Sequence, residues 1–292
     1  MKIAIYGKPY QNELNNEIAG ILDIIEKRGF EAVIYEKYER FLSERGHLKS
    51  HRKTFNRENV AIEDYGCLVS IGGDGTLLDT VTLVRDSNVP IVGLNAGRLG
   101  FISSLSIDEL AEVLTALEDG NFEVDKRSLI QVETKRGVFG NLNFGLNEVT
   151  LHKKDTASMI KIETYVNDEF LNTYWADGLI VSSPTGSTAY SLSCGGPIIV
   201  PGSENFVITP IAPHNLNVRP VVVSNNVTLK LSADGRSENF LLAIDSRPET
   251  IYPNEEIKIS KAPFTISLLK PKGHTFLTTM RNKLAWGFDK RN

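Results

Sequence analysis

The feature that most limits the possible folds is a change in the spacing of apolar residues near residue 122. Before that point, short apolar runs at 3–6, 67–71 and 91–94 alternate with stretches of helical spacing. Alternating strands and helices pack as a parallel sheet covered by helices. The sequence therefore predicts an N-terminal α/β domain with a Rossmann-like parallel sheet over residues 1–121.

The second part of the chain has the period of two that is typical of strands. Its apolar runs are separated by turn residues such as Arg136-Gly137 and Asn167-Asp168. This pattern predicts an all-β domain over 122–271, packed as a sandwich of two sheets. Helical spacing returns at the end of the chain. We expect 272–292 to form a helix that joins the first domain.

Two local predictions lie within the first domain. Ser106-Ile107-Asp108-Glu109 has the form of a capping box, which predicts the start of a helix. The polar stretch 42–58 is rich in Arg, Lys, His and Asn. It is expected to be a surface insertion, with a mobile lid over a nucleotide as the alternative.

The composition excludes several classes of protein. With 41% hydrophobic and 23% charged residues, the chain has no apolar run near the roughly 18 residues of a membrane span. A formal net charge of −4 gives no basic surplus for nucleic acid. The start of the chain resembles a strand and not a signal peptide, and the two cysteines are Cys67 and Cys194. We therefore expect a cytoplasmic protein.

The strongest local signal is the run Gly72-Gly73-Asp74-Gly75-Thr76, between an apolar strand and a helix. Glycines let backbone N–H groups approach phosphate oxygens, and the helix adds its positive end. The run predicts a phosphate loop with Asp74 as its reactive side chain. The alternative is a tight turn in which Asp74 caps the helix. The Walker and dinucleotide-fingerprint motifs are absent from the sequence.

A second signal is the segment 177–191, in which a strand runs into a turn of Ser, Thr and Gly residues. The hydroxyl groups can donate and accept hydrogen bonds, and Tyr190 offers a ring for stacking. This chemistry suits a nucleoside better than a bare phosphate. The alternative is a serine-rich loop that caps a short helix.

The third signal is the pair Asn147-Glu148 beside a short strand. Such a pair can bind the vicinal hydroxyls of a ribose, as carboxylates do in many dinucleotide sites. The alternative is a surface pair without a role. The histidines have no spacing typical of metal ligands.

Together these three elements resemble the NAD kinase family. Its GGDGT loop matches residues 72–76, its short NE/ND motif matches Asn147-Glu148, and its long glycine- and threonine-rich segment matches 177–193. Further agreement at 95–101 and 195–198 extends the resemblance over about 67–250.

The resemblance implies an enzyme that transfers the γ-phosphoryl group of ATP to the 2′-hydroxyl of the adenosine ribose of NAD. It further implies a divalent cation, Mg²⁺ or Mn²⁺, and a homodimer or homotetramer. Asp74 is the implied catalytic residue. The implied substrate-binding residues are Gly73, Asp74, Gly75, Asn147, Glu148, Trp175, Asp177, Thr188, Ala189, Tyr190, Ser191, Ser193 and Arg247. The implied phosphate loop comprises Gly72, Gly73, Gly75, Thr76 and Arg98.

The chain departs from the family pattern at two positions. Some members have a basic residue where this chain has Trp175, and many have glutamine where it has Arg247. Either change alters how one end of the nucleotide is held. For Asp74 two roles are open: it accepts the proton of the 2′-hydroxyl as the P–O bond forms, or it binds the metal ion.

Two other functions compete with this interpretation. The GGDG loop also occurs in lipid kinases and resembles that of phosphofructokinases, so a lipid or sugar kinase is one alternative. The segment 177–193 argues against it. A dinucleotide sensor without catalysis is the other, and the intact Asp74 argues against that.

Overall fold

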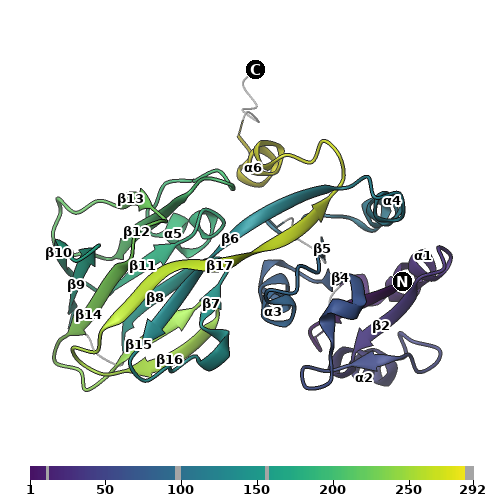
Figure 1. The fold of residues 1–292 in the computed structure, drawn as a ribbon, viewed down its shortest axis with the longest axis horizontal. Helices are drawn as coiled ribbons and strands as arrows, with labels where there is room; N and C mark the ends of the chain where they lie inside the picture. The colour runs from purple at the N-terminus through teal and green to yellow at the C-terminus, as the bar shows by residue number, and fades with distance from the viewer. Residues whose placement is uncertain (11–12, 96–99, 155–157, 287–292) are drawn as a thin grey trace. The chain divides into compact units, whose positions relative to one another are not determined.

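A computed structural model describes residues 1–10, 13–95, 100–154 and 158–286 of the chain (Figure 1). The chain forms two compact units. Unit 1 comprises Met1–Lys126 and Ile266–Asn292, and unit 2 comprises Arg127–Thr265. No helix in the described residues has the length and apolar character needed to cross a membrane.

Unit 1 is built on a parallel sheet with the strand order β5-β4-β1-β2-β3. The strands are β1 (Lys2–Gly7), β2 (Glu31–Tyr35), β3 (Thr54–Phe55), β4 (Tyr65–Ile71) and β5 (Ile91–Leu94). The last residues of the long strand β17 (Ile257–Lys270) join β5 in parallel, where Leu268 pairs with Ile91. The prediction of an α/β unit with a parallel sheet is confirmed.

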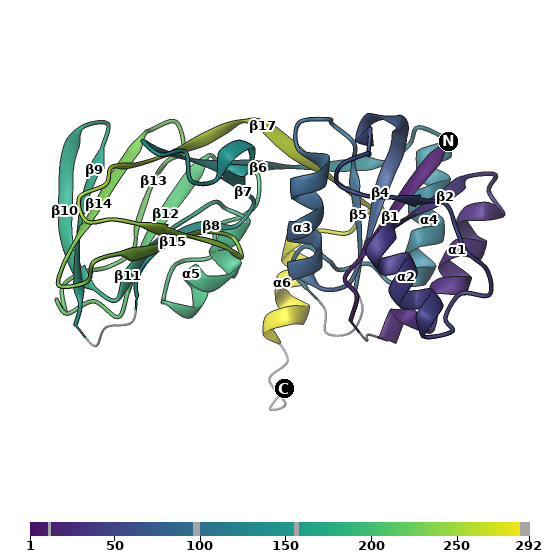
Figure 2. The same cartoon turned by 90° about the horizontal axis from the view of Figure 1, so that it is seen from below.

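Helices cover both faces of this sheet (Figures 1 and 2). They are α1 (Ile18–Glu26), α2 (Glu36–Glu44), α3 (Asp74–Val84) and α4 (Ile107–Glu118). Helix α3 packs on β4 and β5, and α1 packs beside α4 on the opposite face. The capping box of α4 is confirmed, since the Ser106 side chain accepts from Glu109 N–H and the Glu109 side chain accepts from Ser106 N–H.

Most of the stretch 42–58 lies outside helices and strands, at 45–53 and 56–58. Helix α2 continues through its first residues, and β3 pairs with β2 at the edge of the sheet. The buried side chains Tyr38 and Leu42 lie on one face of α2. Apart from these two elements the expected surface insertion is confirmed, and the lid over a nucleotide stays a prediction.

Unit 2 consists of two mainly antiparallel sheets. One has the order β10-β9-β14-β17, with β6 beside β17 and β7 beside β6; the other has the order β13-β12-β11-β8-β15-β16. The strands of the first sheet are β6 (Glu123–Thr134), β7 (Phe144–Gly145), β9 (Ile160–Val166), β10 (Glu169–Ala176), β14 (Leu229–Asp234) and β17. Those of the second are β8 (Glu148–Lys153), β11 (Gly178–Ser182), β12 (Asn205–Ile211), β13 (Val221–Ser224), β15 (Phe240–Ile244) and β16 (Arg247–Ile251).

The core of unit 2 is apolar and draws on both sheets. Fully buried side chains such as Ile162 and Leu229 from one sheet belong to the same cluster as Leu151 and Leu242 from the other. Inward-facing residues alternate with outward-facing ones along these strands, which gives the period of two in the sequence. The predicted sandwich-type β fold is confirmed.

The chain ends with helix α6 (Phe276–Leu284). The Thr275 side chain caps it by accepting the N–H of Thr278. Within unit 1, the ring of Phe276 packs near that of Phe101, with 6.5 Å between the ring centroids.

Candidate functional site

The predicted site residues fall into two groups, one in each unit. In unit 1 the glycine-rich loop connects β4 to α3, as the sequence predicts. Gly72 has φ of 151°, and a Cβ at this position would lie 2.4 Å from the Thr76 hydroxyl oxygen. Both facts require glycine. The next residue, Gly73, is the N-cap of α3.

Asp74 is the first residue of α3, and its side chain does not cap the helix. Its carboxylate instead accepts three backbone N–H groups from another loop. The donors are Phe101 at 3.0 Å, Ile102 at 3.3 Å and Ser103 at 2.9 Å. The alternative of Asp74 as a helix cap is therefore wrong. The bonds fix the carboxylate beside the phosphate loop.

Ser103 links this second loop to the first one. Its buried hydroxyl donates to the carbonyl oxygen of Gly72 at 2.8 Å and to that of Leu94 at 3.0 Å. The N–H of Gly72 also donates to Leu94 O. The loops after β4 and β5 thus form one hydrogen-bonded unit around Asp74. The predicted residue Arg98 lies outside the described residues.

The segment after β1 lies beside the phosphate loop because β1 and β4 are adjacent parallel strands. The Tyr10 hydroxyl is 3.4 Å from that of Thr76, and Lys8 Nζ is 3.0 Å from the Asp79 carboxylate. Sequence reasoning missed Lys8 and Tyr10. The signal for them was indirect: carboxyl ends of adjacent parallel strands meet at one edge of a sheet, where α/β proteins bind ligands.

In unit 2 the structure brings the second and third sequence signals together. Glu148 pairs with Ser182 across β8 and β11, and the chain then turns back over Asn147. Ser183 N–H donates to Asn147 O at 2.8 Å, and a Cβ at Gly186 would lie 2.0 Å from that oxygen. Gly186 is therefore needed for this close approach.

Asp245 holds the same pair from the other side. It begins the two-residue turn between β15 and β16 with φ of 51°, a conformation that Asp tolerates better than most residues. Its carboxylate accepts the N–H groups of Leu146 at 3.0 Å, Asn147 at 2.8 Å and Glu148 at 3.2 Å. Sequence reasoning missed Asp245, although an acidic residue directly after the apolar strand 240–244 was a visible signal.

Glu148 has an unusual electrostatic environment. Burial, and then the nearby Asp245 carboxylate, raise the pKa of Glu148 to about 8, against a single backbone N–H bond from Tyr190 that lowers it. Within the described part of the chain, Glu148 Oε2 and Asn147 Oδ1 are buried without a hydrogen-bond partner. Unpaired buried polar atoms are costly unless a ligand or water satisfies them.

The remaining residues of the predicted segment differ in how accessible they are. Tyr190 begins the short helix α5 (Tyr190–Ser193) and is 41% exposed, so its ring is available for stacking. Ser193 is exposed, and Thr188 and Ala189 are half-buried. Ser191 is fully buried, with its hydroxyl 2.8 Å from that of Thr209, so its side chain serves packing.

Asp177 and Trp175 lie away from Glu148. Because Glu148 pairs with Ser182, Asp177 is five residues further along the strand pair, or roughly 16 Å at about 3.3 Å per residue. Its carboxylate forms an ion pair with Lys153 at 2.6 Å. Trp175 is 50% exposed, with Lys161 Nζ 4.8 Å from its ring centroid. Neither residue contacts Asn147 or Glu148 directly in the described residues, but the charge of Asp177, like that of Glu148, acts on Tyr190.

Arg247, the second departure from the family pattern, lies near that cluster. Its guanidinium donates to the carbonyl oxygens of Leu142 and Phe144, just before the Asn147-Glu148 pair. Burial raises the pKa of Asp245, and the Arg247 guanidinium opposes that rise. In this chain Arg247 supports the pair through the backbone and through Asp245.

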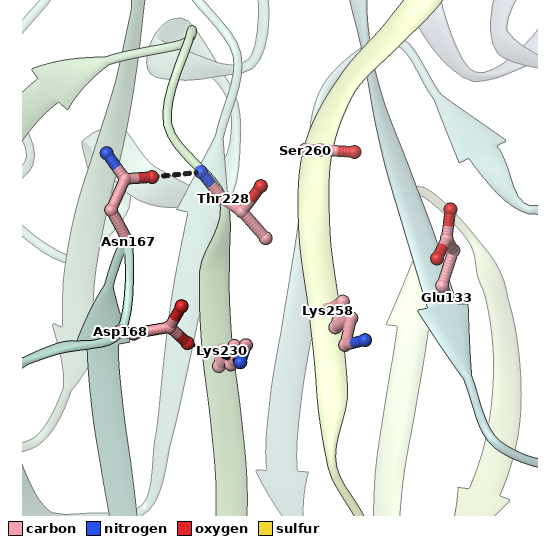
Figure 3. A pocket seen from close by; sticks show the side chains of 7 residues that line it. All are labelled: Glu133, Asn167, Asp168, Thr228, Lys230, Lys258 and Ser260. Carbon is pink, nitrogen blue, oxygen red and sulfur yellow. Dashed lines mark hydrogen bonds and ion pairs between the residues drawn. The ribbon is translucent and has the colours of Figure 1, made fainter.

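A pocket of about 370 Å³ lies elsewhere on unit 2 (Figure 3). It is lined by Glu133, Asn167, Asp168, Thr228, Lys230, Lys258 and Ser260. Lys230 forms an ion pair with Asp168, and Lys258 forms one with Glu256 at 3.7 Å. The lining also includes the acidic Glu133, so its two lysines are matched by two carboxylates. The pocket has no surplus positive charge for a nucleotide, and it contains none of the predicted site residues.

Comparisons with known families match most of the chain. The model of the ATP-NAD kinase N-terminal domain matches residues 3–122, and that of the ATP-NAD kinase C-terminal domain matches residues 146–270. An NAD kinase from Flavobacterium psychrophilum is 45% identical over a 294-residue alignment that covers 100% of both chains.

Two solved structures share the fold. A yeast NADH kinase complexed with NADH has a TM-score of 0.84 at 20% identity, covering 99% of this chain and 88% of its own. An Archaeoglobus fulgidus NAD kinase in complex with ATP has a TM-score of 0.75 at 24% identity, covering 98% of both chains. At these identities the likeness concerns the fold alone.

Proposed function

Because the chain belongs to the NAD kinase family, we propose that it transfers the γ-phosphoryl group of ATP to the 2′-hydroxyl of the adenosine ribose of NAD. The products are NADP and ADP. The observation that carries this proposal is the full-length similarity to an NAD kinase combined with an intact GGDGT loop at 72–76.

Asp74 is the catalytic residue in this proposal. Phosphoryl transfer has a loose transition state, so orientation and charge neutralisation supply most of the catalysis. Three N–H bonds orient the Asp74 carboxylate, which accepts the proton of the 2′-hydroxyl as the new P–O bond forms. The N–H groups of the glycine-rich loop and the start of α3 bind phosphate oxygens. Gly72, Gly73, Gly75, Thr76 and Arg98 form the phosphate loop.

Unit 2 supplies the residues that bind the dinucleotide. The unpartnered atoms of Asn147 and Glu148 suit the hydroxyls of a ribose, because each hydroxyl both donates and accepts a hydrogen bond. The exposed ring of Tyr190 stacks on a base or nicotinamide ring. The other contacts come from Gly73, Asp74, Gly75, Trp175, Asp177, Thr188, Ala189, Ser193 and Arg247, and the buried Ser191 holds α5 through Thr209.

A divalent cation, Mg²⁺ or Mn²⁺, accompanies ATP in this reaction. In the described residues no group of three His, Cys, Asp or Glu side chains is placed to hold a metal ion. This fits Mg²⁺, which proteins bind through one or two carboxylates together with the phosphates of the nucleotide. When bound, the cation neutralises charge on the phosphates. Binding this cation is the alternative role for Asp74, whose carboxylate lies beside the phosphate loop.

We also propose a cytoplasmic homodimer or homotetramer. Cys67 and Cys194 are free thiols, which suits a reducing compartment. Large apolar side chains such as Trp175 and Leu216, 50% and 86% exposed, are available for contact between subunits. Sedimentation of the purified protein measures the subunit number directly.

The test of the function is a coupled assay for NADP formed from NAD, ATP and Mg²⁺ by the purified protein. NADP and ADP in equal amounts support the proposal. Bound NAD without ADP release indicates a dinucleotide sensor. Phosphorylation of a lipid or sugar hydroxyl, with NAD ignored, indicates the other kinase classes.

A further inference from the structure

Two carboxyl groups approach each other where the β15–β16 turn meets the start of β8. The Asp245 carboxylate receives three N–H groups from consecutive residues, Leu146 to Glu148. Asp245 N–H in turn donates to Glu148 O at 2.9 Å. These hydrogen bonds with Asp245 therefore fix the backbone that carries the Asn147 and Glu148 side chains.

The Glu148 carboxyl has far fewer hydrogen bonds. It accepts one backbone N–H, from Tyr190, and its Oε2 has no partner in the described residues. The Glu148 residue is 8% exposed, and the neighbouring Asn147 is 7% exposed. A buried carboxylate with a single donor is unfavourable, particularly beside a second negative charge.

We infer that Asp245 is a positioning residue for dinucleotide binding: it fixes the backbone of 146–148, and its negative charge makes Glu148 bind a ribose hydroxyl as a neutral carboxylic acid. This inference rests on the proposed function, since it concerns how the same site recognises NAD. It assigns a role to Asp245 and a protonation state to Glu148.

The hydrogen bonds decide which of the two groups carries the proton. Burial raises the pKa of Asp245, but three N–H donors and the guanidinium of Arg247 oppose that rise and favour its charged form. Glu148 has one donor and faces the Asp245 charge, and these conditions with burial raise its pKa to about 8. Tyr190 at the start of α5 and Cys194 directly after it also face Glu148, and burial raises the pKa of each, so both are neutral at pH 7.

A protonated Glu148 makes the pair complementary to a vicinal diol. The O–H of Glu148 donates to one ribose oxygen, and Asn147 Oδ1 accepts from a ribose hydroxyl. Ionisation of Glu148 removes the donor and adds a negative charge close to an anionic ligand. NAD binding should therefore weaken as the pH rises above about 8.

The test is the dissociation constant for NAD, measured by calorimetry at pH 7 and pH 9 with the full-length protein. If only the protonated form binds, and about one molecule in eleven is protonated at pH 9, affinity falls about tenfold between the two pH values. Glu148→Gln replaces the acid by a neutral donor. It should bind NAD within about threefold of wild type at pH 7 and show no loss at pH 9.

Asp245→Asn keeps an acceptor oxygen for the N–H groups but removes the charge. Its loss of affinity should begin at a lower pH than in wild type, which a purely structural role would not produce. Glu249→Gln, an exposed change on the adjacent strand, is the matched control and should keep the wild-type pH profile.

Equal affinity of the wild type at both pH values would overturn the inference. So would a loss of more than about tenfold in Glu148→Gln at pH 7, since the carboxylate would then be the binding form. These outcomes leave the kinase proposal intact if NADP is produced. NAD binding with the expected pH profile but without NADP formation would overturn the kinase proposal alone, and no NAD binding would overturn both.

Discussion

The backbone N–H of Ser103 lies 2.9 Å from a carboxylate oxygen of Asp74, although the two residues are 29 positions apart in the chain. Together with the N–H groups of Phe101 and Ile102, it orients the proposed catalytic carboxylate. The same serine ties its loop to Gly72 through its hydroxyl. The phosphate loop and its acidic side chain are therefore positioned by the loop after β5.

Replacement of Asp74 tests its proposed role directly. Asp74→Asn should lower kcat by about 100-fold or more, because the amide cannot accept the proton of the 2′-hydroxyl. Its NH₂ group also faces backbone N–H donors, so stability should fall by about 1–3 kcal/mol. Steady-state kinetics and thermal melting measure both effects. Asp86→Asn, an exposed change just after α3, is the control and should change neither.

The same variant separates the two roles considered for Asp74. If the residue holds the metal ion, titration with Mn²⁺ in the presence of ATP should show weaker cation binding in Asp74→Asn. If it acts as a base, turnover is lost while the affinity for Mn²⁺ stays unchanged. We expect the second result, because the carboxylate oxygens already accept three N–H groups.

Ser103→Ala should affect activity through the position of Asp74. The change removes the buried hydroxyl that bonds Gly72 O and Leu94 O, and should lower stability by about 1–3 kcal/mol. We expect kcat to fall by about tenfold with little change in the KM for NAD, because the dinucleotide-binding residues of unit 2 are untouched. Ser104→Ala is the control at the adjacent residue. Wild-type kcat in Ser103→Ala would contradict the positioning role.

Glu148 should also make folding stability depend on pH. Its pKa is about 8 in the folded protein and 4.5 without the fold, so the folded state binds the extra proton between these values. Stability from this group is therefore lost as the pH rises from 4.5 to about 8, by up to about 1.4 kcal/mol per pH unit. The free energy of unfolding can be measured by urea titration at pH 5 and pH 7.5. Relative to wild type, Glu148→Gln should be more stable at pH 7.5 than at pH 5. If the two proteins differ in unfolding free energy by the same amount at both pH values, this prediction is contradicted.

Local sequence patterns predicted the elements that depend on local interactions. The capping box Ser106 to Glu109 starts α4 because both of its hydrogen bonds lie within one turn. The strand before the phosphate loop was predicted from its run of apolar residues, and β4 is buried from Cys67 to Ile71. Such features need no knowledge of distant parts of the chain.

The partners of the site residues could not be predicted in this way. The N–H donors of Asp74 come from 27 to 29 residues along the chain, and Asp245 lies 97 to 99 residues from the N–H groups that it binds. These contacts depend on the order of strands in each sheet. The short strand β3 within the stretch 42–58 could not be predicted for the same reason, because Thr54 and Phe55 form it by pairing with the distant strand β2.

The glycines of the phosphate loop offer a test that separates folding from ligand binding. A Cβ at Gly73 or Gly75 would meet no atom within 4 Å, and neither glycine has positive φ. Gly73→Ala and Gly75→Ala should therefore fold normally, and Gly75→Ala should stabilise α3 by up to about 1 kcal/mol. If backbone N–H groups here bind phosphate, the added methyl group blocks close approach, and we expect the KM for ATP or NAD to rise about tenfold or more. Gly20→Ala on the exposed face of α1 is the matched control, because it also adds a methyl group in open space and should leave both KM values unchanged. Wild-type kinetics in both loop variants would contradict a phosphate-binding role for this backbone, since nothing in the protein itself opposes the extra methyl group.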